Sequence, residues 1–598
     1  MEKNIILILL LAPLSVIICF YLKKYIFHKL KKSYLFVFPT IFYFLIFLLL
    51  LINQNDLNEL SFKYIKVHDI NISLSFSFNH INKLMSLVVL IVSICVLIYS
   101  SSFIKSENID RYFRYSFFIS IFISAMIFFS LSNDLLSSFI FWEFLGLCSF
   151  FLIAYYNKDK KAIFSSLMAF WITRFGDLFF LMGIIIVLLN AESLMFSQIN
   201  NLYTKEYSNI QNISLLFICI GVLTKCAQFP FTIWLPRAMK GPTPVSALIH
   251  SATMVVAGVL LLFKLAPAIG NYQLTQNFIF YAGLMTSLTC SIHAFKEDDF
   301  KKILAYSTLS HIGFMLIPIG QNLSDLSYFH LYSHSFFKSM LFLMAGYIIL
   351  TYNSTSIKDL KNKVKINSVM GFSLLIGCLS LAGVFPLTGS FSKEYIIINF
   401  ISDRNVVDIG LLFISLFFTC MYSSKILFTV ISFENIKFNA DKNIILLIPI
   451  VILGIFSLLG FQTKDVFDNF INPNFPKITF YELALIQIFI ISSFGIFYFK
   501  ESRVFDLSKN FFNFSSYFVE IEKIYITIYK HVFIELANFI AWFDRNIIDG
   551  IINFIPYQVS SLSLKIQSVQ NGFIRNYAAI LLIFIILLII LLGVGLSI

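Results

Sequence analysis

The chain has 598 residues, of which 58% are hydrophobic and only 13% are charged. This charged share is about half of that in soluble domains, and apolar runs long enough to cross a bilayer recur from end to end, so the composition excludes a soluble protein and indicates a polytopic membrane protein. The net charge of +12 lies largely in short loops between those runs, where the bias of Lys and Arg towards the cytoplasmic side explains it better than nucleic-acid binding does.

The apolar runs predict an all-α polytopic fold with about sixteen membrane-spanning helices. Pro230 and Pro386 each remove a backbone donor within such a run, so we expect two of these helices to be discontinuous. The expected spans lie near residues 4–22, 33–52, 80–103, 112–131, 134–156, 160–190, 212–240, 246–265, 275–296, 302–320, 327–351, 366–403, 407–433, 443–463, 481–500 and 578–597.

The loops between these spans alternate in charge. One set, which includes residues 23–32 and 105–114, is rich in Lys and Arg, whereas the other, which includes 53–79 and 191–211, is poor in them. This bias predicts that the first set faces the cytoplasm or the matrix and that both termini lie on the opposite side.

The two predicted breaks lie in different halves of the chain. Paired discontinuous helices are typical of inverted-repeat transporters, whose site lies near the middle of the membrane. We therefore expect a core at 112–433 that consists of two inverted repeats, about 112–265 and 275–433. The other expected regions are N-terminal transmembrane helices at 1–111, accessory ones at 434–500, a lateral amphipathic region at 501–577 and a C-terminal transmembrane anchor at 578–598.

The segment from Glu520 to Asn576 is too polar to cross a membrane and too apolar to be free in water. Its polar side chains recur at steps of mostly three or four, which predicts a long amphipathic helix along a surface. We expect Gly550 and Pro556 to interrupt it. Two interpretations stay open for this helix: it lies on the membrane surface, or it clamps neighbouring subunits together.

Ionisable residues recur inside the apolar runs, although a charge at the centre of a bilayer costs about 2.5–3.5 kcal/mol on insertion scales. Glu143 and Lys225 have no opposite charge nearby in the sequence, so each needs a partner from another helix or water. Burial disfavours a charged lysine and a nearby glutamate favours it, so a Glu–Lys pair whose separation changes is a switchable proton site. The candidate site residues are Glu143, Asp177, Lys225, His250, Lys301, His330, His334, Lys338, Lys393 and Glu394.

Several of these groups have a plain structural alternative. Arg174 and Asp177 share a helix face and are also consistent with a structural ion pair. His311 and His293 fit satisfied core or interfacial histidines better than relays. Lys264 and Lys425 are long enough to extend towards the membrane surface, and Lys301 is also consistent with a simple loop lysine.

Sites for metals and cofactors are not indicated. His330 and His334 lie four residues apart without a carboxylate or cysteine nearby as a third ligand, and they offer no opposite axial ligand for a haem. The eight cysteines form no CxxC pair, and the chain has no GxGxxG or Walker motif. We therefore expect proton-handling chemistry and no cofactor in this chain.

Several long motifs occur in an order that resembles a known family. The stretch LTKCAQFPFTIWLPRAMKGPTPVSALIHSATMVVAG closely resembles the signature of the antiporter-like subunits of respiratory complex I, as do FWEFLGLCSFFLIAYY, RFGD, DFKKILAYSTLSHIGFM, HLYSHSFFKSMLFLMAG and LAGVFPLTGSFSKEYI. The resemblance covers about Phe78 to Glu394. The tail, with EKIYITIYK, DRNIIDGI and NGFIRNYA, resembles that of the subunit L family of bacterial NADH:quinone oxidoreductase, called subunit 5 in mitochondria.

The resemblance implies a proton-translocating, non-redox subunit of the membrane arm of NADH:quinone oxidoreductase, driven by electron transfer in other subunits. It implies that NADH, FMN, Fe–S clusters and quinone are bound by partner subunits, and that the lateral helix runs along sister antiporter-like subunits. The membrane is then the bacterial inner membrane, with the mitochondrial inner membrane as the alternative.

The same resemblance implies roles for particular residues. Glu143 matches the key glutamate of the family, Asp177 its partner acid and Lys225 its pumping lysine. Glu394 stands where aspartate is usual, and His311 stands where glutamine is common. The other matches are His250, His330, His334 and Lys338 to the central hydrophilic chain, Lys301 to its basic residue near the DxKK motif, and Lys393 to the lysine of the second broken helix.

Two other functions remain open. The large subunit of a multi-subunit sodium/proton antiporter shares the same core, but usually has further spans after the lateral region, whereas this chain has one. A structural tether with an idle channel is less consistent with the full set of intramembrane charges.

Overall fold

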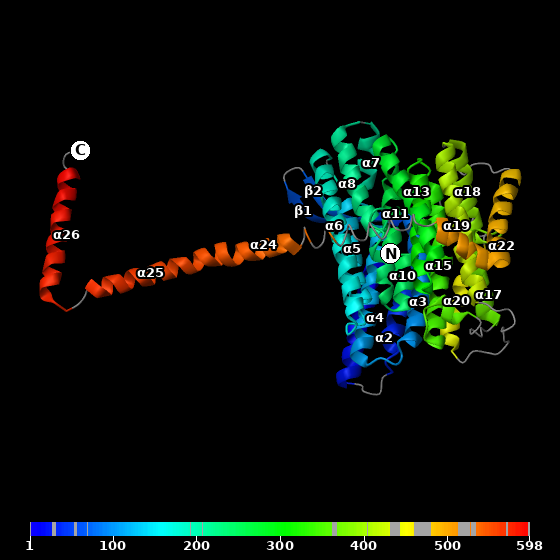
Figure 1. The fold of residues 1–598 in the computed structure, drawn as a ribbon, viewed down its shortest axis with the longest axis horizontal. Helices are drawn as coiled ribbons and strands as arrows, with labels where there is room; N and C mark the ends of the chain where they lie inside the picture. Colours follow the sequence, from blue (N-terminus) through cyan, green and yellow to red (C-terminus); the bar gives the residue numbers. More distant parts are fainter. Residues whose placement is uncertain are drawn as a thin grey trace. The chain divides into compact units, whose positions relative to one another are not determined.

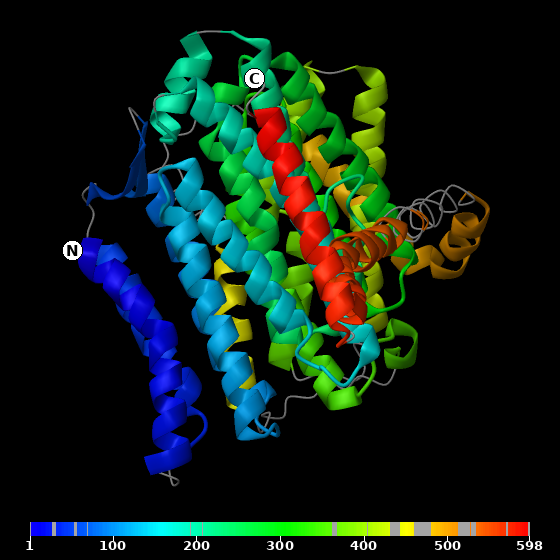
Figure 2. The same ribbon diagram turned by 90° about the vertical axis from the view of Figure 1, so that its left-hand side faces the viewer.

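The computed structural model describes residues 2–26, 31–52, 57–67, 70–191, 193–205, 207–361, 368–403, 405–430, 443–459, 480–511, 527, 531, 534–569 and 572–595. It forms two compact units, Met1–Asp506 and Leu507–Ile598, which we describe separately. Figure 1 and Figure 2 show the helices of the first unit side by side as one bundle.

The first half of this bundle is formed by long apolar helices joined by short segments. Its elements are α1 (Glu2–Tyr21), a π-helical turn η1 (Leu22–Ile26), α2 (Tyr34–Ile52), α3 (His80–Phe103), α4 (Ile109–Leu131), α5 (Leu135–Ile153), α6 (Lys160–Asn190), α7 (Phe196–Lys205), α8 (Asn209–Lys225), α9 (Trp234–Arg237), η2 (Ala238–Lys240), α10 (Thr243–Ser251), α11 (Met254–Lys264) and α12 (Ala266–Ile269).

The second half continues in the same way. Its elements are α13 (Gln273–Lys296), α14 (Phe300–Ile319), α15 (Ser324–Tyr352), α16 (Ile357–Leu360), α17 (Ser368–Ala382), α18 (Thr388–Asp403), α19 (Val406–Val430), α20 (Ile444–Leu458) and α22 (Phe480–Phe511). Across both units, twelve of the described helices are long and apolar enough to cross a membrane, and four further apolar segments of 10–17 residues belong to α8, α17, α20 and α22. The chain is therefore a helical polytopic membrane protein, and the count of about sixteen spans remains a prediction.

A β-hairpin interrupts the helices and was not predicted. The strands β1 (Leu57–Val67) and β2 (Ile70–Phe78) pair antiparallel within a stretch that the sequence analysis treated as a loop. The signal was present, because Ile72, Leu74, Phe76 and Phe78 alternate with polar residues, as expected of a strand with two unlike faces. Ser75 on β2 donates through its backbone N–H to Asp134 Oδ2 at 2.7 Å, which ties the hairpin to the start of α5.

Both predicted helix breaks are present. α8 ends at Lys225 and helical structure resumes at Trp234, so the break surrounds Pro230. α17 ends at Ala382 and α18 begins at Thr388, so the second break surrounds Pro386. At that break Gly383 has φ +95°, a conformation that side-chain-bearing residues rarely adopt.

A third break lies inside the predicted span at 246–265, which the structure contains as one apolar helical stretch, Thr243–Lys264. α10 ends at Ser251 and α11 starts at Met254. The chain has no proline or glycine at this point, but Thr253 Oγ1 donates to the Leu248 carbonyl at 2.7 Å and so takes an acceptor of the preceding helix. Such local bonding of a threonine side chain competes with helix continuation, and it gives no clear sequence signal.

The second unit begins with α24 (Glu535–Phe543), which continues through a π-helical turn η6 (Asp544–Ile548) into α25 (Asp549–Val569). Gly550 and Pro556 both lie inside α25, so the predicted interruption is wrong. Pro556 is the eighth residue of α25 and removes one backbone hydrogen bond there, but the helix continues past it to Val569. After Gly572, α26 (Ile574–Gly595) provides the predicted C-terminal span; residues 512–526 of the lateral segment lie outside the described residues.

Candidate functional site

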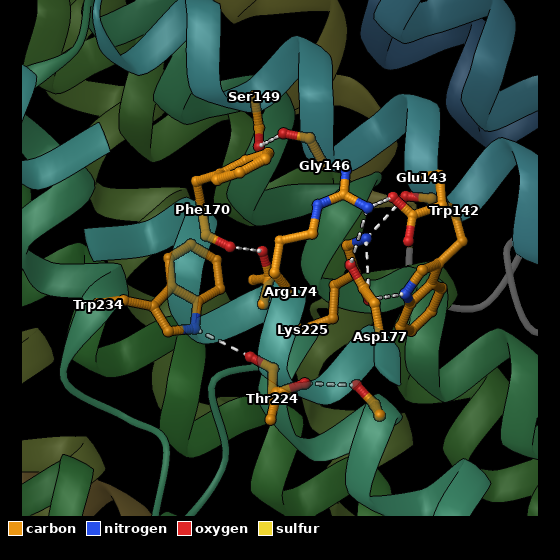
Figure 3. A network of polar contacts seen from close by, with 12 residues as sticks. Trp142, Glu143, Gly146, Ser149, Phe170, Arg174, Asp177, Thr224, Lys225 and Trp234 are labelled. Atoms are coloured by element: carbon orange, nitrogen blue, oxygen red, sulfur yellow. Dashed lines mark hydrogen bonds and ion pairs between the residues drawn. The ribbon is translucent and has the colours of Figure 1, made fainter. Parts of the chain in front are cut away.

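Glu143 on α5 and Arg174 on α6 form an ion pair at the edge of the bundle. Both side chains are partly exposed, at 22% and 31%. Arg174 also lies 4.0 Å from Asp177 Oδ2, one turn further along α6, and its guanidinium lies over the ring of Phe170. In Figure 3 the guanidinium of Arg174 lies between the two carboxylates.

Lys225 lies further inside, at the last residue of α8, and is fully buried. Its Nζ is 3.7 Å from Asp177 Oδ1 and donates a 2.7 Å hydrogen bond to the Trp142 carbonyl. The indole N–H of Trp142 donates to the same Asp177 oxygen at 2.6 Å, and its ring lies 4.6 Å below the lysine Nζ. A Cβ at Gly146 would lie only 3.2 Å from Nζ, so this position keeps space for the lysine.

The two helices that carry Asp177 and Lys225 approach each other through glycines. A Cβ at Gly176 would lie 1.6 Å from Thr224 Oγ1, and one at Gly221 would lie 2.7 Å from Phe180 Cβ. Only hydrogen fits at these two positions. The close packing of α6 on α8 therefore depends on Gly176, which precedes Asp177, and on Gly221, which lies one helical turn before Lys225.

These contacts join Glu143, Arg174, Asp177 and Lys225 into one chain of alternating charges. The sequence predicted that Glu143 and Lys225 each need a partner from another helix or water; among the described residues, Glu143 pairs with Arg174 and Lys225 pairs with Asp177, in both cases across two helices. The sequence does not reveal the partner of Glu143, because Arg174 reaches it across the contact between α6 and α5. A simple ion pair between Arg174 and Asp177 is therefore an incomplete description, because Arg174 connects two carboxylates on different helices.

His250 lies at the end of α10, next to the third break, and is buried. Its ring lies 5.7 Å from the ring of Phe342, and its Nδ1 makes no hydrogen bond to a residue that the structure describes. The break frees the carbonyl of Ser251, which accepts a 3.3 Å hydrogen bond from His334 Nδ1 on α15. The break therefore brings His334 on α15 into contact with the residue that follows His250.

His330, His334 and Lys338 lie on one face of α15 as predicted and are completely buried. Lys338 Nζ donates to Ser307 Oγ at 2.7 Å. His330 bonds through Nδ1 to Ser392 Oγ on α18 at 2.8 Å and through Nε2 to His311 Nδ1 on α14 at 3.0 Å. The row therefore extends to His311 on α14 and to Ser392 on α18.

Lys301 has a position of its own. It is buried near the start of α14 and donates to the carbonyls of Met239 and Gly241 at 2.8 and 2.7 Å. These carbonyls come just before α10, so Lys301 holds the chain between the first break and His250. None of its described hydrogen bonds joins it to the histidine row.

Lys393 and Glu394 lie on α18 just after the second break and are both 1% exposed. Lys393 Nζ donates to the carbonyls of Leu381 and Ala382 at 2.6 and 3.3 Å, which are the last residues of α17. Glu394 accepts a hydrogen bond from Gln487 on α22, and the Gln487 amide also donates to the Gly383 carbonyl at 3.0 Å. Although adjacent, the two residues have different partners.

Lys264 and Lys425 were expected to extend towards the membrane surface, but both amines hold helix ends instead. Lys264 donates to the carbonyls of Ser130 and Ser132 at 2.9 and 2.7 Å, and Lys425 to those of Phe295 and Glu297 at 2.8 and 2.7 Å. Lysines at the carbonyl ends of helices are favoured by the helix dipole.

The sequence analysis did not single out Trp142, Gln487 or Ser392. Gln487 had a usable signal, because it is an amide within an otherwise apolar run. Trp142 and Ser392 had none beyond their position next to Glu143 and Lys393. Among the residues that the structure describes, no group of three or more His, Cys, Asp or Glu is placed to hold a metal ion.

Two family models match the chain. Residues 132–422 match the model described as "NADH:quinone oxidoreductase/Mrp antiporter, TM", and residues 64–113 match "NADH-Ubiquinone oxidoreductase (complex I), chain 5 N-terminus". All the candidate site residues lie within the first match.

Curated relatives match over most of the chain. NADH-ubiquinone oxidoreductase chain 5 of Hypocrea jecorina is 34% identical over 460 residues, which cover 74% of this chain and 66% of that protein. NAD(P)H-quinone oxidoreductase subunit 5, chloroplastic, of Mesostigma viride is 30% identical over 571 residues, which cover 88% of this chain and 87% of that protein.

Solved structures share the fold at lower identity. A chain of the Mrp complex from Dietzia sp. DQ12-45-1b aligns with a TM-score of 0.72 at 19% identity, over 98% of this chain and 63% of that one. A chain of the membrane-bound sulfane sulfur reductase, an archaeal respiratory membrane complex, aligns with a TM-score of 0.68 at 18% identity, over 82% and 99%. At these identities the likeness is one of fold alone.

Proposed function

We propose that this chain, which belongs to the complex I subunit 5 family of antiporter-like membrane subunits, moves protons across the membrane as part of NADH:quinone oxidoreductase. Electron transfer in partner subunits supplies the energy, and this chain contributes no redox centre. NADH, FMN, Fe–S clusters and quinone belong to those partners. The observation that carries the proposal is the charge chain Glu143–Arg174–Asp177–Lys225, which runs from a partly exposed ion pair to a fully buried lysine.

The first step is a change of charge at Glu143. When Glu143 is protonated or shielded, Arg174 loses its main partner and turns to Asp177, 4.0 Å away in the present arrangement. The negative field of Asp177 at Lys225 is then neutralised. A buried ammonium without a matching charge is strongly disfavoured, so Lys225 releases its proton. The reverse movement of Arg174 restores the charged lysine.

The later steps use the buried row in the centre of the bundle. The proton passes from Lys225 by way of His250 towards His334 and His330, and on to Lys393. Lys338 and Lys301 supply positive charge beside the row, and Lys301 also holds the chain ahead of α10. Glu394, held by Gln487, lies at the far end and completes the candidate route.

A second candidate function is that of the large subunit of a sodium/proton antiporter, which the fold similarity to a chain of the Mrp complex favours. The two functions differ in the ion and in the source of energy. Uptake of radioactive sodium into vesicles that contain the purified complex, without NADH, distinguishes them. Sodium uptake driven by a pH gradient supports the antiporter; proton uptake that depends on NADH oxidation supports the complex I function.

The proposed partners are other complex I membrane subunits, and sister antiporter-like subunits are the proposed contacts of the helix that runs from α24 to α25. Its side chains are almost all exposed in the described unit, including Phe539 at 60% and Ile552 at 60%. A long helix with exposed apolar side chains needs a lipid or protein surface to cover it. The proposed location is the bacterial inner membrane, with the mitochondrial inner membrane as the alternative.

The substitution Lys225→Ala tests the proposed function. We expect the complex to assemble and to oxidise NADH, but to move fewer protons for each electron pair in sealed vesicles. Lys161→Ala is the matched control, because Lys161 is an exposed lysine at the start of α6. Unchanged proton movement by Lys225→Ala would contradict the proposed function.

A further inference from the structure

His311 on α14 is bonded into the histidine row, although the sequence analysis favoured a core or interfacial histidine over a relay at this position. It is completely buried. Its Nδ1 lies 3.0 Å from His330 Nε2, and the two rings are stacked with centroids 5.2 Å apart and an interplanar angle of 11°. His330 Nδ1 in turn lies 2.8 Å from Ser392 Oγ. One hydrogen-bonded line therefore crosses from α14 through α15 to the second broken helix.

The chemistry of imidazole makes this line directional. A neutral ring has one N–H and one bare nitrogen, so the tautomers of His311 and His330 are fixed together. In one arrangement His311 Nδ1–H donates to His330 Nε2, and His330 Nδ1–H donates to Ser392. In the other, Ser392 O–H donates to His330 Nδ1, and His330 Nε2–H donates to His311 Nδ1.

The far nitrogen of His311 is available to receive a proton. His311 Nε2 is buried and has no hydrogen-bond partner among the described residues, and the same holds for His334 Nε2. Because the Ser251 carbonyl can only accept, His334 carries a proton on Nδ1, and its Nε2 is therefore the basic atom. The rings of His334 and His311 lie 5.6 Å apart.

We propose that His311 is a proton-carrying residue that connects His334 to the second broken helix. A proton binds His311 Nε2, the Nδ1 proton passes to His330 Nε2, and the His330 Nδ1 proton passes to Ser392 Oγ. The original hydroxyl proton of Ser392 leaves towards the neutral amine of Lys393, the next residue of α18. One proton enters and one leaves, no bond between heavy atoms changes, and the line changes from the first tautomeric arrangement to the second.

His293 is a useful contrast within the same chain. It is half-buried on α13, its Nδ1 is 2.8 Å from the Thr289 carbonyl of its own helix, and its ring lies 5.5 Å from the ring of Tyr306. The contacts given for this ring are thus with Thr289 on its own helix and Tyr306 on α14, and neither partner is a histidine. Its replacement should leave proton movement unchanged.

The inference rests on the proposed function. Three variants distinguish a failure of the inference from a failure of the proposed function. His311→Gln keeps a side chain that can hydrogen-bond to His330 but cannot accept a proton at neutral pH. We expect it to lose a measurable part of the NADH-driven proton movement, though less than Lys225→Ala because glutamine is common at this position in the family, whereas His293→Gln keeps the wild-type value. Wild-type movement in His311→Gln together with a loss in Lys225→Ala overturns the role of His311 alone; wild-type movement in both overturns the proposed function itself.

A spectroscopic readout separates proton transfer from a merely structural role. In infrared difference spectra on addition of NADH, complexes with ¹⁵N-labelled histidine should show imidazole bands from the tautomer change, which His311→Gln loses and His293→Gln keeps. If His311→Gln fails to assemble, Ser392→Ala decides, because it removes only the hydroxyl that accepts from His330, and Ser333→Ala, which removes the other hydroxyl bonded to Ser392 at 2.9 Å, is its control. Lower proton movement in assembled Ser392→Ala supports the inference, and wild-type movement overturns it.

Discussion

The two broken helices place a buried lysine beside a proline break, but they stabilise its charge differently. At the first break, Lys225 precedes the break and depends on Asp177 and Trp142, which come from two other helices. At the second break, Lys393 follows the break and bonds to the carbonyls of Leu381 and Ala382 at the end of α17. The amine thus has a side-chain carboxylate as a partner in one case and backbone carbonyls in the other.

This difference shows at which of the two breaks the charge of the lysine can be controlled. Backbone carbonyls at the end of a helix are a fixed source of negative potential, which no protonation event removes. A carboxylate paired with a movable arginine is a variable source. The first break is therefore suited to be switched from outside, through Glu143 and Arg174, and the second to receive a proton from the histidine row.

The largest expected effect distinguishes Asp177, the carboxylate at the first break, from Glu394, the carboxylate at the second. Asp177→Asn removes the charge next to Lys225, so we expect proton movement in vesicles to fall as far as in Lys225→Ala. Glu394→Gln should have a smaller effect, because it removes the acid at the far end of the route but leaves Lys225 and Lys393 with their own partners. Equal losses in the two variants would show that the second break is switched in the same way as the first.

A backbone substitution at the second break should have the next largest effect. Gly383 has φ +95°, and a Cβ there would lie 3.0 Å from Lys393 Cδ. We expect Gly383→Ala to destabilise the fold by roughly 1–2 kcal/mol and to lower the temperature at which the assembled complex loses NADH oxidation. A thermal midpoint equal to that of the wild type would contradict the importance of this conformation.

The smallest expected effect concerns the space around Lys225. A Cβ at Gly146 would lie 3.2 Å from Lys225 Nζ, so Gly146→Ala should displace the amine by a few tenths of an ångström and reduce proton movement only partly. Gly410→Ala on α19 is the matched control, since nothing lies within 4 Å of its Cβ position. Equal activities of the two variants would mean that Lys225 has more freedom than the structure indicates.

The sequence predicted well those features that depend on one segment. Residues 80–103 and 160–190 were predicted as spans and are the observed bounds of α3 and α6, because long apolar runs there end at polar or charged residues. The breaks at Pro230 and Pro386 followed from the missing backbone donor of proline. The family resemblance marked the lysines and histidines of the buried row before their positions were known.

Features that depend on contacts between segments were not predictable in this way. The partner of Glu143 depends on the reach of Arg174 from another helix, and the bond between His311 and His330 depends on how α14 packs on α15. The break at Thr253 arises from a side chain that bonds within its own helix. The hairpin was missed because the search for long apolar runs passes over short alternating strands.

The central claim is that Glu143 acts on Lys225 through Arg174 and Asp177. It is tested most directly by a double-mutant cycle of Glu143→Gln and Lys225→Ala, with protons moved per electron pair as the readout in sealed vesicles. If the two residues act in one chain, each single variant loses proton movement, and the double variant is no worse than Lys225→Ala alone. Losses that add independently in the double variant would contradict the account.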